Sequence, residues 1–176
     1  MSLETLAMVP AAPEYEAEVL AMMAEFKAEH PPRYWNAPEL LAGDFPAYLR
    51  RLRRNALGLD LPYGFVPTTT FWMLRDGADI VGVSSLRHHL VPVLEIEGGH
   101  IGYAIRPGER RKGYGTRLLA LMLDEARALG LSRALVTCDT DNLGSARIIQ
   151  KNGGVFEGEA PSPRTGKPVS RYWIQL

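Results

Sequence analysis

Residues 106–117 read Arg-Pro-Gly-Glu-Arg-Arg-Lys-Gly-Tyr-Gly-Thr-Arg and stand between an apolar run and a helical pattern. The run before them, His-Ile-Gly-Tyr-Ala-Ile at 100–105, has the composition of a strand, which Pro107 ends. The run after them carries apolar residues at helical spacing from Leu118 to Leu129, and Gly130 closes it. The sequence therefore predicts a strand, a basic glycine-rich loop and a helix in succession.

This loop has the composition of an anion site. A helix start exposes unpaired N–H groups and a partial positive charge, so a phosphate binds there when small residues let it approach. Gly113 and Gly115 supply that closeness. An ordinary helix start favours acidic residues, whereas this one carries four cations: Arg110, Arg111, Lys112 and Arg117. We predict that the loop binds phosphate.

Two familiar phosphate loops do not fit. A Walker loop has a lysine and then a hydroxyl residue after its second glycine, but Gly115 is followed by Thr116 and Arg117. A dinucleotide fingerprint has a third glycine three residues after the second, where Leu118 stands. Both failures disfavour a nucleotide-binding domain, which is the third reading of this chain.

The spacing Arg110-x-x-Gly113-x-Gly115 resembles the acyl-CoA pyrophosphate loop of the GNAT family of N-acetyltransferases. The order of elements over 71–173 is similar to the core of that family: a hairpin at 69–83, the strand at 100–105, the loop and its helix, a strand at 133–138, and a helix at 142–152. The sequences at 98–103 and 171–174 further resemble an uncharacterised bacterial branch of predicted acetyltransferases.

The resemblance implies one α/β domain over 1–176, with a mixed, mostly antiparallel central sheet that contains a splayed parallel pair and is flanked by helices. Its N-terminal part, 1–66, would form helices at 13–30 and 38–58 that wall the acceptor site. The part from 67 to 176 would bind acetyl-CoA, with two further strands at 155–159 and 169–176. Exposed edge strands in this fold often pair between subunits, so a homodimer is one possible state.

The implied reaction is direct transfer of the acetyl group from acetyl-CoA to a primary amine of a small molecule or peptide. The N–H of Tyr103 or Ala104 would bind the thioester carbonyl, where negative charge grows. The resemblance implies these acetyl-CoA contacts: Tyr103, Ala104 and Ile105 along the pantetheine; Gly113, Tyr114, Gly115 and Thr116 around the pyrophosphate; Arg110, Arg111 or Lys112 on its oxygens; and Asn142 and Ser145 beside the pantetheine arm.

Two departures from the family pattern concern the mechanism. Many members have a tyrosine acid where this chain has Ile149, and histone-type members have a glutamate base where it has Gly99. The amine must lose a proton, so a base is needed. Our candidates are, in order, His100, Glu97 and Glu95 for the base, and Tyr103 or Tyr172 for the acid. The departures also favour an alternative, a GNAT-like module that binds or senses acyl-CoA without catalysis.

Charge is distributed unevenly along the chain. Residues 106–117 carry a net +4 and residues 4–29 a net −5, whereas the whole chain has a formal net charge of +0. Without a net positive field the protein is a poor partner for a nucleic-acid polymer, and we predict none. Asp44, Glu95 and Glu97 are candidates to hold the acceptor's ammonium group.

Composition limits the remaining classes. With 176 residues, 46% hydrophobic and 23% charged, the chain suits one folded domain. The single cysteine, Cys138, excludes an internal disulfide and a cysteine-built zinc site, and we expect it in the core. Adjacent His88 and His89 in a strand point to opposite faces, so we predict no metal. No long apolar run occurs, which predicts a soluble, cytoplasmic protein with no membrane partner.

Overall fold

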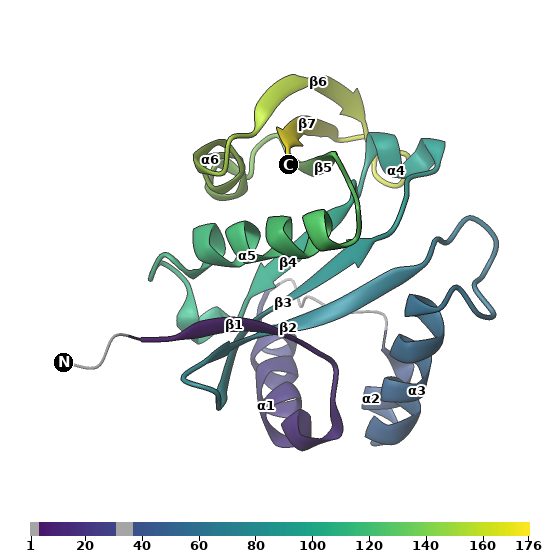
Figure 1. Ribbon diagram of the computed structural model, residues 1–176, viewed down its shortest axis with the longest axis vertical. Helices are drawn as coiled ribbons and strands as arrows, with labels where there is room; N and C mark the ends of the chain where they lie inside the picture. The colour runs from purple at the N-terminus through teal and green to yellow at the C-terminus, as the bar shows by residue number, and fades with distance from the viewer. Residues whose placement is uncertain (1–3, 31–36) are drawn as a thin grey trace.

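The computed structural model describes residues 4–30 and 37–176. Its strands form two sheets (Figure 1). The first is antiparallel in the order β1-β2-β3-β4, built from β1 (Leu6–Pro10), β2 (Thr68–Arg75), β3 (Asp79–Arg87) and β4 (Ile101–Ile105). The second has the order β5-β7-β6, built from β5 (Arg133–Asp139), β6 (Val155–Pro161) and β7 (Pro168–Gln175). The hairpin predicted at 69–83 and the later strands are confirmed.

Strand β1 is a feature that the sequence did not predict. It pairs along β2 from Leu6 opposite Arg75 to Pro10 opposite Phe71, so the N-terminal segment adds a strand as well as helices. Thr5 and Asp76 tie its start to the turn after β2, because each backbone N–H donates to an oxygen of the other residue at 2.9 Å. A five-residue edge strand without a neighbouring turn signal is defined by this distant partner rather than by its own pattern.

The N-terminal helices are shorter than predicted. A 3-10 turn, η1 (Pro13–Tyr15), leads into α1 (Glu16–Lys27). The single helix expected over 38–58 is wrong: α2 (Pro38–Leu41) and α3 (Phe45–Ala56) are separated at Gly43, whose φ is 74°. Asp44 caps α3 by accepting the Ala47 N–H at 2.8 Å.

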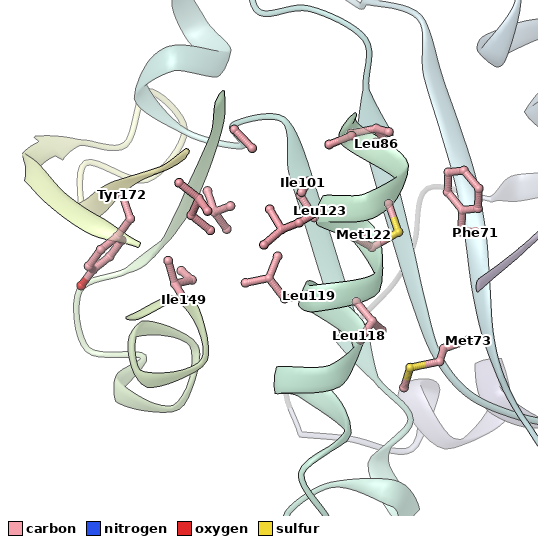
Figure 2. Packing of buried hydrophobic residues seen from close by; sticks show 14 of the residues in the cluster. Phe71, Met73, Leu86, Ile101, Leu118, Leu119, Met122, Leu123, Ile149 and Tyr172 are labelled. Atoms are coloured by element: carbon pink, nitrogen blue, oxygen red, sulfur yellow. The ribbon is translucent and has the colours of Figure 1, made fainter. Parts of the chain in front are cut away.

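Helices cover both faces of the first sheet. Helix α5 (Tyr114–Ala128) crosses one face, and α1 and α3 lie against the opposite face (Figure 1). Figure 2 shows Leu118 and Met122 of α5 on the side of β2 and β3, with Leu119 and Leu123 turned toward Ile149 and Tyr172. One helix thus packs between the two sheets. The shorter elements are α4 (Pro92–Ile96), η2 (Pro107–Glu109) and α6 (Leu143–Lys151).

The two sheets meet where His100, just before β4, contacts Leu135 of β5. The His100 N–H donates to the Leu135 carbonyl at 2.7 Å, and the His100 Nδ1 accepts the Leu135 N–H at 2.9 Å. Gly99 makes this approach possible, because a Cβ at that position would collide with the Leu135 carbonyl oxygen. Beyond this junction no β4–β5 ladder forms, so the strands separate and leave a cleft. Within the described residues, no helix has the length and apolar character needed to cross a membrane.

Candidate active site

The start of α5 has the geometry of a phosphate site. Gly113 is the N-cap in the left-handed conformation, with φ 87°, and no side chain caps the helix. The first-turn N–H groups of Tyr114, Gly115 and Thr116 therefore have no intrahelical acceptor. A Cβ at Gly113 would meet no atom within 4 Å, so the space above this turn is open. An anion placed there meets several donors and the positive end of the helix dipole.

Gly115 is required for helix packing, whereas Gly113 is required for the turn before α5. A Cβ on Gly115 would stand 2.6 Å from Ile148 Cδ1, so this glycine lets α6 pack against α5. The side chain of Tyr114 also points away from the open turn, because its hydroxyl donates to Glu4 at 2.6 Å and accepts from Arg75 at 3.2 Å. Only the backbone of Tyr114 faces the candidate anion site.

Most cations of the basic loop are bound to acidic residues of the N-terminal segment. Arg106 forms ion pairs with Glu25 at 2.7 Å and Glu18 at 2.9 Å, and Arg110 pairs with Glu29. Other pairs join Arg117 to Glu4 and Lys112 to Glu109. The oppositely charged stretches thus lie against each other. Among the loop cations, Arg111 alone has no ion-pair partner in the described chain. Backbone donors, rather than free cations, therefore dominate this site.

The cleft between β4 and β5 has a volume of about 240 Å³. Four of the predicted site residues line it: Glu97, Tyr103, Asn142 and Ser145. Cys138, which was expected in the core, is half-buried and lines the cleft as well. Asn142 also caps α6 by accepting the Ser145 N–H at 3.0 Å. Further polar lining residues were not predicted: Arg87, Thr137, Asp139 and Arg164. Arg164 comes from the loop between β6 and β7, and no local signal connects that loop to β4.

The backbone of β4 divides its groups between β3 and the cleft. Arg87 N–H donates to the His100 carbonyl, and Arg106 N–H donates to the Val81 carbonyl. Because strand groups alternate in direction, the even-numbered residues of β4 bond to β3. The N–H of Tyr103 therefore faces the cleft, whereas that of Ala104 faces β3. Of the two donors considered for the thioester carbonyl, the geometry favours Tyr103.

The side chain of Tyr103 spans the cleft. Its hydroxyl lies 2.8 Å from the Ser145 Oγ at the start of α6. Burial raises the pKa of Tyr103 to about 12, although the hydrogen bond to Ser145 acts in the opposite direction. The phenol therefore keeps its proton at neutral pH and is able to donate it in a hydrogen bond. Burial likewise raises the pKa of the neighbouring Cys138 thiol to about 11, which leaves this thiol protonated and weakly nucleophilic.

His100 lies at the sheet junction and does not line the cleft. It is 7% exposed, and burial lowers its pKa to about 4, with the cations of Arg133 and Arg87 adding to the effect. The ring is therefore neutral at pH 7, and its Nδ1 lone pair is already engaged by the Leu135 N–H. His100, the first candidate for the base, therefore joins the two sheets in this structure.

The other candidate acids and bases also have partners or lie elsewhere. Glu97 accepts hydrogen bonds from Ser162 Oγ at 2.6 Å and Arg164 Nε at 3.0 Å, and the Arg164 guanidinium lowers the pKa of this carboxyl. Glu95 is exposed on α4 outside the cleft lining. Tyr172 is buried in the core against Phe156, with ring centroids 5.5 Å apart.

The two departures from the family pattern have structural causes. Gly99 is pressed against the Leu135 backbone, so a glutamate has no room at this position. Ile149 is fully buried in the core between α5 and the second sheet, and points away from the cleft. A tyrosine there would have to enter the core.

A second cavity of about 210 Å³ lies on the opposite face of the first sheet, under α1 and α3. Arg87 lines both this cavity and the cleft. In the described ranges, no three side chains of His, Cys, Asp or Glu gather into a group that could hold a metal ion. His88 instead bonds to Thr69 Oγ1 at 2.8 Å.

Comparison with known families agrees with this geometry. A family profile described as "Acetyltransferase (GNAT) domain" matches residues 10–155, which is most of the chain. The chain therefore belongs to the GNAT acetyltransferase family, and the resemblance drawn from its sequence is confirmed. No curated protein matches it significantly.

Solved structures share the fold over nearly the whole chain. RimJ from Mycobacterium smegmatis, in complex with CoA-disulfide, has a TM-score of 0.74 and 17% identity, over 97% of this chain and 82% of that one. Ribosomal-protein-S5-alanine acetyltransferase from Vibrio fischeri has a TM-score of 0.72 and 17% identity, over 99% and 95%. The microcin C7 self-immunity acetyltransferase MccE, in complex with acetyl-CoA and AMP, has a TM-score of 0.71 and 14% identity, over 97% and 92%.

Proposed function

We propose that this protein is an acetyl-CoA-dependent N-acetyltransferase that transfers the acetyl group directly to a primary amine. The observation that carries the proposal is the separation of β4 from β5 beside an uncapped start of α5. Family membership supports acetyl transfer in general, and two of the similar structures contain CoA or acetyl-CoA. The pantetheine would lie in the cleft and the pyrophosphate on the N–H groups after Gly113.

The proposed reaction is one nucleophilic displacement. The neutral amine attacks the thioester carbon, a C–N bond forms, and the carbonyl oxygen gains charge that the Tyr103 N–H stabilises. The C–S bond then breaks with its electron pair on sulfur, the nitrogen loses a proton to solvent, and the CoA thiolate gains one. The Tyr103 hydroxyl, which is hydrogen-bonded to Ser145, would donate to that sulfur.

The test measures thiol release from acetyl-CoA with a panel of primary amines. We expect turnover with at least one amine, and Tyr103→Phe lowers kcat by about 100-fold because the donor to sulfur is lost. The affinity for acetyl-CoA, measured by calorimetry, stays the same in this variant. Equal kcat in the variant and the native protein would remove Tyr103 from the mechanism.

The second candidate function is a module that binds acyl-CoA without catalysis. The observation that favours it is the closed space at Gly99 together with the core position of Ile149, because neither site has room for the usual catalytic side chain. Tight acetyl-CoA binding with no thiol release above background, across amines of every class in the panel, would support this second function instead.

A further inference from the structure

The cavity under α1 and α3 has both apolar and polar walls, and we call it the acceptor cavity. It is enclosed by α1 on one side, α3 on another, and β2 and β3 beneath. Its apolar lining comprises Val19, Met22, Met23, Leu52, Trp72 and Val83. Such a surface suits a ligand with an apolar body, because burying that body removes apolar area from water.

Ser84, Ser85 and Arg87 line one part of the acceptor cavity, which we call its polar end. The other arginine of the lining, Arg51, is paired with Glu39 at 2.6 Å. The Arg87 Nη1 donates to the carbonyls of Gly98 and Gly99, both at 3.0 Å. A guanidinium carries five N–H donors, so three remain after these two bonds. No carboxylate of the described residues forms an ion pair with Arg87, in contrast to Arg106, which has two.

An arginine in this position is a cation without a counter-ion. Arg87 is half-buried, and this burial lowers the pKa of its guanidinium. Burying a charge without a partner is costly, whereas a bound anion would offset that cost with charge-assisted, bidentate hydrogen bonds. Arg87 therefore provides a binding site for a planar anion such as a carboxylate.

Trp72, which also lines the acceptor cavity, carries an unsatisfied polar group. Its indole Nε1 is fully buried and has no hydrogen-bond partner among the residues that the structure describes. The ring is fixed by stacking on Phe45, with centroids 6.3 Å apart, and by the edge contact with Tyr15. A buried donor without an acceptor is rare in native proteins. A ligand oxygen would satisfy it only after the side chains around Trp72 moved, because the atom is closed to solvent.

The polar end lies next to the point of acetyl transfer. A Cβ on Gly102 would stand 3.2 Å from the Ser85 Oγ and 3.8 Å from the Arg87 Nη1, so the α-carbon of Gly102 faces both side chains. The next residue is Tyr103, whose N–H faces the cleft and the expected thioester. An anion on Arg87 is thus about one residue along β4 from the acetyl group. An amine that lies one carbon from a carboxylate matches this spacing.

We propose that the acceptor is an α-amino acid with an apolar side chain, held by its carboxylate on Arg87 and by its side chain in the acceptor cavity. This inference rests on the proposed acetyl transfer. The α-amine is then directed from the acceptor cavity toward the cleft. A peptide N-terminus lacks the carboxylate next to its amine and is a poorer acceptor.

The first arm of the test uses the native protein and matched amines. We compare kcat/KM for L-leucine, L-methionine and L-phenylalanine with their carboxamides, and with 3-methylbutylamine, which is leucine without its carboxylate. The free acids are preferred by about 100-fold, because a charge-assisted hydrogen-bonded pair is lost with the amides. Equal kcat/KM for acids and amides would overturn the inference and leave acetyl transfer intact.

The second arm removes the cation. Arg87→Met lowers kcat/KM for leucine by about 100-fold more than it lowers kcat/KM for leucinamide, so the preference for the free acid disappears. Arg87→Lys keeps a cation and restores part of the preference, while Trp72→Phe raises KM for the acids alone. Arg53→Met, at an exposed position of α3, is the matched control and changes neither substrate. A preference that persists in Arg87→Met would contradict the assignment.

A binding readout separates this inference from the proposed function. Calorimetry follows L-leucine binding to protein saturated with CoA, in the native and Arg87→Met forms. If no amine is acetylated but leucine binds the native protein at least 10-fold more tightly than the variant, acetyl transfer fails and the site assignment stands. If amines are acetylated and leucine binds both forms equally, the site assignment fails alone.

Discussion

His100 joins the two sheets with two atoms. Its N–H donates to the Leu135 carbonyl, and its Nδ1 accepts the Leu135 N–H. Both backbone polar groups of Leu135 are therefore hydrogen-bonded at the point where the strands begin to separate. The imidazole accepts the Leu135 N–H in place of a backbone carbonyl from a neighbouring strand. The cleft therefore starts at a defined residue, and the neutral ring is a requirement of the fold.

Protonation of His100 should destabilise the protein in acid. Its pKa is about 4 in the folded state against 6.5 for the unperturbed group, so between these values the unfolded chain binds a proton that the folded protein does not. Stability is thus lost as the pH falls from 7 to 4, by about 3 kcal/mol for this group. His100→Asn keeps an acceptor for the Leu135 N–H but does not titrate in this range.

The measurement is the free energy of unfolding in urea at pH 7 and pH 4 for both proteins. Protonation of carboxylates with lowered pKa values, such as Glu25 and Glu97, also destabilises the protein in acid, but it does so equally in the native protein and in His100→Asn. The difference between the two pH-dependent losses isolates His100. Identical losses would show that the ring is already protonated or is exposed in the folded protein.

At the scale of elements, α1 is fastened to the loop before α5 by ion pairs. Arg106 binds Glu18 and Glu25 and also donates to the Ile80 carbonyl at 3.2 Å, while Glu25 accepts the Gly108 N–H at 3.0 Å. Burial alone would raise the pKa of Glu25, but the Gly108 N–H and Arg106 lower it overall. The same helix also lines the acceptor cavity, so these pairs hold both the loop and the cavity wall in place.

Removing Arg106 should cost more stability than removing an exposed arginine. We expect Arg106→Ala to lower the free energy of unfolding by about 2 kcal/mol, because two partly buried carboxylates lose their partner. Arg54→Ala is the matched control, since Arg54 and its partner Asp60 have side chains that are 52% and 71% exposed. That pair contributes less than about 0.5 kcal/mol. Equal losses in urea unfolding would contradict a fastening role for α1.

The sequence predicted those elements whose signals are local. The loop, α5, the hairpin and the later strands follow from glycines, turns and apolar spacing within a few residues of each other. Strand β1 was missed because its partner lies more than sixty positions away. The break between α2 and α3 was missed because the apolar spacing continues across Gly43 and Asp44. Arg87 and Arg164 reach the cleft only through the fold, and nothing beside them in the chain indicates it.

At the scale of the whole molecule, two cavities lie on either side of one sheet and meet at Arg87. The cleft opens between β4 and β5, and the acceptor cavity lies beneath α1 and α3. The sequence indicated opposite charge in 4–29 and 106–117, and the structure shows those stretches paired with each other. Overall neutrality therefore reflects internal pairing, and the anion site depends on backbone N–H groups at the start of α5.

Two glycines of similar geometry bracket α5 and give a matched test of that site. Gly113 before the helix has φ 87° and Gly130 after it has φ 93°, and a Cβ on either would meet no atom within 4 Å. A valine at either position strains the backbone by a similar amount, on the order of 1–2 kcal/mol. Only the valine at 113 would intrude on a bound pyrophosphate.

Calorimetric titration with acetyl-CoA of the native protein, Gly113→Val and Gly130→Val tests the central claim most directly. We predict that the native protein and Gly130→Val bind with similar affinity, whereas Gly113→Val binds at least about 100-fold more weakly, a difference of about 2.7 kcal/mol. Unchanged affinity in Gly113→Val, or an equal loss in both variants, would contradict an acetyl-CoA site at the start of α5.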